Sequence, residues 1–128
     1  MKSTKAISGL FWIAAAYDGI LGAAFLVLPS SVFTYFQVTP PNHYGYVRFP
    51  AALLVVFALM FAAAAWAPQR NRNLIPYGIL LKASYCGVAF GYWFTQGIPN
   101  MWKPFAVIDL VFGILFWAAY RQLAQDDS

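Results

Sequence analysis

Charged side chains are scarce in this sequence of 128 residues: they make up 9% of the chain, against roughly 25% in a soluble domain. Hydrophobic residues make up 62%, so polar groups could not cover a water-facing surface. The net charge of +4 is too dilute to indicate a nucleic-acid partner, and we expect none. The length allows one domain, which we expect to be a single integral membrane domain over residues 1–128.

The sequence is also poor in residues that bind metals and cofactors. Its one cysteine, Cys86, excludes an intramolecular disulfide and a CxxC pair, and with them the four-helix membrane thiol oxidoreductases. Its one histidine, His43, excludes haem ligation by two histidines of one chain. No metal-ligand spacing, phosphate-binding glycine loop or Ser-His-Asp set is present. We therefore expect no metal and no cofactor, and we favour a binding protein over an enzyme.

Four long apolar runs fill most of the chain. A spanning helix needs about 20 apolar residues, and the runs predict spans at about 6–28, 48–67, 75–94 and 104–120. The first run is longer than the apolar region of a signal peptide and contains Asp18, so we expect a span there. The predicted fold is an all-α bundle of four transmembrane helices.

The basic residues outside the spans are unevenly distributed. The side with both termini and the second loop holds Lys2, Lys5, Arg70, Arg72 and Arg121, whereas the other side holds Arg48 and Lys103. Positive charge favours the cytoplasmic side. The sequence therefore predicts a multi-pass protein of the bacterial inner membrane with both termini in the cytoplasm.

Three ionisable residues lie inside the predicted spans: Asp18, Lys82 and Asp109. A fourth, Arg48, begins the second span. A charge at the centre of a span costs about 2.5–3.5 kcal/mol, whereas a large apolar residue returns only about 0.3–0.6 kcal/mol. The third span has few large apolar residues, so its lysine needs a partner. At a rise of 1.5 Å per residue, the Lys82 side chain can reach either or both aspartates.

The helical faces agree with this pairing, because aromatic and small residues share the faces of the three charged residues. We expect Arg48 to reach towards Asp109, so that the four charges sum to zero. Tyrosine hydroxyls would complete the polar centre. The predicted ligand or proton site comprises Asp18, Lys82, Asp109, Arg48, Tyr85, Tyr17 and Tyr92. The alternative is that the charges only fix the register of the helices.

One glycine pair indicates a contact between helices. Gly87 and Gly91 form a GxxxG pattern on a face away from Lys82. Such a pattern can mediate a homodimer, or it can allow close packing within one chain. Membrane lipid is the other expected partner.

The layout resembles the small bacterial four-helix membrane proteins grouped as DoxX-like and related families. The resembling features are Gly19-Ile-Leu-Gly22, Pro29, Arg48 and the basic turn Pro68–Arg72. The resemblance implies a topology, not an activity. The chain is also similar to small multidrug transporters in size and in the acidic residue of its first helix, but Lys82 and Asp109 depart from that family's simple carboxylate site.

Three functions follow from these patterns. The leading hypothesis is an inner-membrane protein that binds a small amphipathic or hydrophobic ligand, or acts as a membrane-complex subunit, around Asp18, Lys82 and Asp109. The second is a proton-coupled small-molecule transporter. The third is a lipid-modifying enzyme that uses the same carboxylates and lysine as acid and base.

Overall fold

The chain is all-helical in a computed structural model that describes residues 2–126, and no strand occurs in that range. The elements are α1 (Lys2–Val27), α2 (Pro29–Tyr35), α3 (Gly45–Trp66), the 3-10 helix η1 (Arg72–Leu74), α4 (Ile75–Thr95) and α5 (Trp102–Asp126). Four of these helices are long and apolar enough to cross a membrane, and they coincide with the four predicted spans. The all-α prediction is confirmed.

Several helix ends differ from the predicted bounds: α1 begins at Lys2, α3 at Gly45 and α5 at Trp102. Pro29 ends α1 but also begins α2, because a proline in the first helical turn lacks only an N–H that would have no partner there. Helix α5 continues beyond the predicted end at residue 120. It does so because Leu123, one turn further, is fully buried among the core residues.

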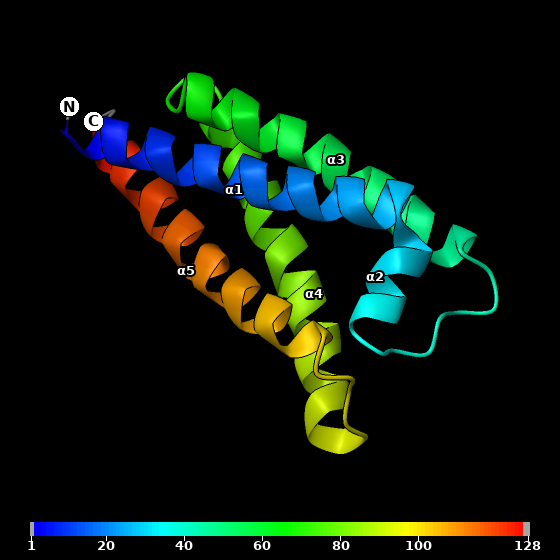
Figure 1. Ribbon diagram of the computed structural model, residues 1–128. Coiled ribbons are helices and arrows are strands. Elements are labelled where there is room, and N and C mark those ends of the chain that lie inside the picture. Colours follow the sequence, from blue (N-terminus) through cyan, green and yellow to red (C-terminus); the bar gives the residue numbers. More distant parts are fainter. Residues whose placement is uncertain (1, 127–128) are drawn as a thin grey trace.

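The four long helices form two antiparallel hairpins (Figure 1). Helix α1 packs along α3, and α4 packs along α5. Both termini lie at one end, and the hairpins diverge towards the other end, where α2 lies (Figure 1). In the first hairpin Gly22 permits a close approach, because a Cβ there would lie 2.8 Å from the carbonyl oxygen of Ala51.

The interior contains two apolar clusters. The first lies towards the termini and is built on stacked aromatic rings, with the centroids of Phe11 and Phe116 4.7 Å apart. The second comprises the buried residues Phe25, Phe33, Ala51 and Met101. On α1 the first cluster ends at Ala14 and the second begins beyond residue 20, so a short interval separates them.

The outer surface of the hairpins is apolar. Large side chains such as Ile13, Ile20, Leu59, Leu80 and Phe94 are exposed along the helices. Such an extended apolar surface is unusual for a soluble monomer. It matches the outer surface expected of helices that contact lipid.

Candidate ion cluster and adjoining cavity

Lys82 lies between two aspartates in the interior. Its Nζ donates to Oδ1 of Asp18 at 2.8 Å and to Oδ1 of Asp109 at 3.0 Å. The side chains of Asp18 and Lys82 are each 1% exposed, whereas that of Asp109 is 12% exposed. The expectation that one lysine can meet both carboxylates is confirmed. We call these three residues the ion cluster.

The ion cluster occupies the interval between the two apolar clusters. Asp18 lies between Ala14 and Phe25 on α1, and Asp109 lies between Met101 and Phe112 along the chain. Asp109 and Lys82 belong to one hairpin, whereas Asp18 belongs to the other. The Lys82–Asp18 pair is therefore an ionic contact between the two hairpins.

Aromatic rings surround the Lys82 ammonium group. Its Nζ lies 5.5 Å from the ring centroid of Tyr17, 5.6 Å from that of Phe61 and 5.3 Å from that of Phe112. Ring faces attract a cation at such distances, more strongly when water is excluded. The lysine stem packs near Gly113, where a Cβ would lie 3.6 Å from that of Lys82. The ammonium group therefore lies among aromatic rings as well as between the two carboxyl groups.

Arg48 does not join the ion cluster, and the expectation of four balanced charges is wrong. Its side chain is exposed, and its Nε donates to the carbonyl oxygen of Leu26 at 3.1 Å. Its guanidinium carbon lies 6.0 Å from the Tyr44 ring. Helix α3 begins at Gly45, so Arg48 lies near the end of the hairpin instead of at the depth of Asp109. With all three groups ionised, the ion cluster carries a net charge of −1.

Two buried oxygens near the centre have no hydrogen-bond partner. They are Oδ2 of Asp18 and the hydroxyl of Tyr17. A buried polar group without a partner costs free energy, and in native proteins such groups usually bind water, a proton or a ligand. Both oxygens are therefore candidates for such binding.

The other predicted tyrosines differ in position. The Tyr85 hydroxyl donates to the carbonyl oxygen of Trp102 at 3.1 Å, so Tyr85 lies beside the ion cluster and fixes the start of α5. Tyr92 is 52% exposed and lies on the outer surface, so the structure does not bring it into the site.

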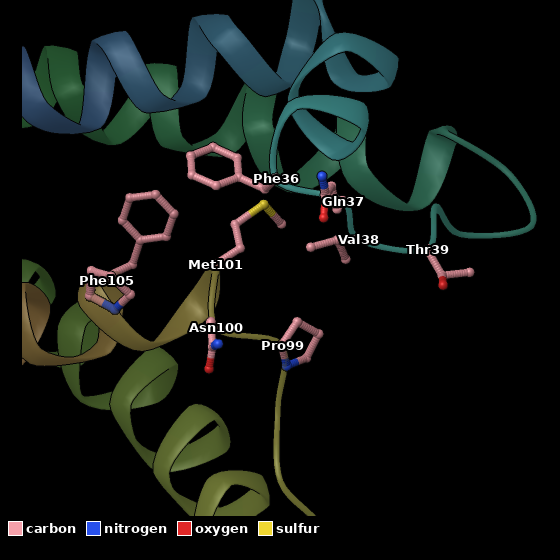
Figure 2. A pocket seen from close by; sticks show the side chains of 9 residues that line it. Phe36, Gln37, Val38, Thr39, Pro99, Asn100, Met101 and Phe105 are labelled. Atoms are coloured by element: carbon pink, nitrogen blue, oxygen red, sulfur yellow. The ribbon is translucent and has the colours of Figure 1, made fainter.

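A cavity of about 670 Å³ opens at the diverging end of the hairpins, between the segment after α2 and the α4–α5 connection. Its lining residues are Phe36, Gln37, Val38, Thr39, Pro99, Asn100, Met101, Pro104 and Phe105. Figure 2 shows Met101 extending towards the segment after α2, with Phe105 further along α5. Phe105 lies one helical turn before Asp109. Asp109, the least buried member of the ion cluster, therefore lies one helical turn beyond the lining of the cavity and is not itself part of it.

Two aromatic residues of the site and the cavity were not predicted from the sequence. Phe112 follows Asp109 at the i+3 position, so helical spacing could have identified it. Phe61 could not have been found, because α3 has no charged residue at that depth to mark its inward face. The cavity depends on how α2 and the α4–α5 connection approach one another, which no local pattern shows.

The chemistry of the site is ionic and aromatic. Among residues 2–126 no group of three His, Cys, Asp or Glu side chains could hold a metal ion. Comparisons of the chain with protein-family models, curated proteins and solved structures give no match. The resemblance to DoxX-like proteins stays a prediction, and the function has to be argued from the ion cluster and the cavity.

Proposed function

We propose that the protein is a four-span protein of the bacterial inner membrane that binds a small amphipathic molecule in the cavity. The apolar part of the ligand lies against Phe36, Val38 and Phe105, and its polar end is directed towards Asp109. The polar end carries a hydrogen-bond donor, an amine or a hydroxyl, because the carboxyl oxygens of the ion cluster accept hydrogen bonds.

The observation that carries this proposal is the junction between the cavity and the ion cluster. Ligand sites are concave, largely apolar and about 300–1,000 Å³ in volume, with a few polar groups that fix orientation. The cavity has that size and an apolar lining, and Asp109 lies one turn beyond its end. Buried ionisable groups in a membrane protein mark functional sites more often than structural ones.

The test is the melting temperature of the purified protein in dodecyl maltoside with ligands of matched chain length. We expect decylamine to raise the melting temperature and decanoate to have no such effect. Asp109→Asn should remove the effect of decylamine, because it removes the anionic acceptor nearest the cavity. Tyr92→Phe is the matched control, since Tyr92 lies on the outer surface, and it should keep the effect.

Two results would contradict the proposal. One is equal stabilisation by the amine and the carboxylate, which would indicate partitioning into the detergent micelle. The other is an amine effect that persists in Asp109→Asn, which would place binding away from the ion cluster.

Proton-coupled transport is the second candidate, and the uncompensated negative charge of the ion cluster favours it. A carboxylate that alternately binds a proton and a cationic substrate couples the two fluxes. Transport predicts that a pH gradient across liposomes drives uptake of an organic cation and that Asp18→Asn abolishes it. A binding protein predicts stabilisation by the amine without uptake.

A further inference from the structure

The charge of the ion cluster is unbalanced by one unit. Two carboxyl groups share one ammonium group, and Arg48, the second cation expected from the sequence, lies at the end of the hairpin. An uncompensated charge in a buried, low-dielectric site is costly, and such a site commonly becomes neutral by binding a proton. The imbalance points to a bound proton.

The titratable groups on the surrounding helices do not remove the imbalance. On α4, Tyr85 donates to the carbonyl oxygen of Trp102, and the Cys86 thiol donates to that of Ala106. On α1, the buried Tyr17 hydroxyl is neutral and unpaired. Helix α3 presents the ring of Phe61, and its own ionisable residues, Tyr46 and Arg48, are exposed. Only the two aspartates and Lys82 therefore set the charge of the site.

The two carboxyl groups are not equivalent. Asp18 is 1% exposed, and its Oδ2 is buried without a donor. Asp109 keeps 12% of its side chain exposed, so its charge can be partly solvated. The ionised form therefore costs more at Asp18 than at Asp109.

We infer that the ion cluster binds one proton, carried on the carboxyl group of Asp18 through Oδ2, while Asp109 and Lys82 remain an ion pair. A proton from bulk water neutralises the Asp18 carboxylate, and the three side chains are then neutral as a set. The inference goes beyond the proposed ligand, since it concerns the protein with nothing bound.

The experiment is infrared spectroscopy of the purified protein at neutral pH in dodecyl maltoside, a detergent without an ester carbonyl. The chain has only four acidic residues, so the carboxylic-acid C=O band is simple to interpret. We expect the wild type to show this band, with an area of one carboxyl group per chain. Absence of the band in the wild type would overturn the inference.

Variants test the charge balance. Asp18→Asn and Asp109→Asn should each remove the band, because one remaining carboxylate balances Lys82. Lys82→Met should double its area, because both carboxyl groups must then be neutral. A band that survives in Asp109→Asn would show that burial alone holds the proton on Asp18, and it would overturn the charge-balance account.

Conservative variants test which carboxyl group carries the proton. Asp109→Glu should leave the frequency of the band unchanged, whereas Asp18→Glu should shift it. A shift in Asp109→Glu would place the proton on Asp109 and overturn the assignment, even if Asp18→Glu fails to fold. If the infrared band is present but decylamine does not raise the melting temperature, only the ligand proposal fails. The two failures are therefore distinguishable.

Discussion

The buried ammonium group of Lys82 is stabilised by its contacts with both aspartates. Moving an ion out of water costs several kcal/mol, and only close partners of opposite charge repay that cost. The Asp109 carboxylate at 3.0 Å, the Oδ1 of Asp18 at 2.8 Å and three aromatic rings provide that compensation. Loss of the ammonium group would leave two buried carboxyl groups together, with no cation among them.

This dependence gives a stability prediction. Lys82→Met should lower the free energy of unfolding by about 3–5 kcal/mol, the usual effect of removing one partner of a buried pair. Because both carboxyl groups must then be neutral, the native state binds more protons than the unfolded state. The stability of this variant should therefore fall as pH rises between about 5 and 8. Unfolding by sodium dodecyl sulfate, followed by circular dichroism, measures both effects.

The matched control removes all three charges. Lys82→Met combined with Asp18→Asn and Asp109→Asn should recover most of the lost stability and abolish the pH dependence, because no unpaired ion remains. If the triple variant is as unstable as Lys82→Met alone, packing of the lysine stem accounts for the loss, and the electrostatic explanation is wrong.

The sequence predicted the residues of the ion cluster because depth along a helix follows directly from residue number. Asp18, Lys82 and Asp109 each lie near the middle of a long apolar helix, and they meet as expected. Arg48 failed the same reasoning because its side chain, in the first turn of α3, donates to the carbonyl oxygen of Leu26 at the end of α1 instead of extending towards Asp109. Exposure of Tyr92 depends on the divergence of the hairpins, which sequence does not encode locally.

At the scale of helices, the contacts within the first hairpin differ from the contacts between the two hairpins. Within the first hairpin Gly22 lets the backbones of α1 and α3 approach closely, and small residues commonly occupy such contacts between spanning helices. Between the hairpins the Lys82–Asp18 pair and the stacked rings of Phe11 and Phe116 provide the contacts. Close backbone packing therefore holds the first hairpin together, whereas side-chain contacts join the two hairpins.

Gly22→Ala tests this packing. A Cβ at that position would lie 2.8 Å from a backbone oxygen and 3.0 Å from the Cβ of Leu54, so the helices must move apart. We expect a loss of about 1–3 kcal/mol, typical of overpacking. Gly9→Ala, on the same helix with nothing within 4 Å, should be neutral or stabilising by up to about 1 kcal/mol. Equal effects of the two variants, measured by unfolding in sodium dodecyl sulfate, would contradict this account.

At the scale of the whole molecule, the homodimer through Gly87 and Gly91 stays a prediction. Gly87 and Gly91 are both exposed on α4, and a Cβ at either position would have no neighbour within 4 Å. The GxxxG pattern therefore does not serve close packing within the chain, which was the alternative explanation to a homodimer. An open face of this kind is equally compatible with lipid.

The orientation in the membrane rests on charges that the fold gathers at one end. By their positions in the helices and connections, Lys5, Arg70, Arg72 and Arg121 belong to the end of the hairpins with both termini, whereas Arg48 and Lys103 belong to the diverging end. An excess of basic residues in short connections sets the cytoplasmic side. The end with the termini should therefore face the cytoplasm, and the cavity should face outward.

Cysteine labelling in intact bacterial cells tests this orientation. In a Cys86→Ser background, Asn42→Cys places a thiol in the α2–α3 connection, and Asn73→Cys places one in η1, where both asparagines are exposed. A membrane-impermeant maleimide should label residue 42 in intact cells and residue 73 only after lysis, because the expected orientation puts the two positions on opposite sides of the bilayer. Neither substitution alters a basic residue, so the charge asymmetry is preserved. If residue 73 alone is labelled in intact cells, the orientation is the opposite one, and the cavity would then receive its ligand from the cytoplasm.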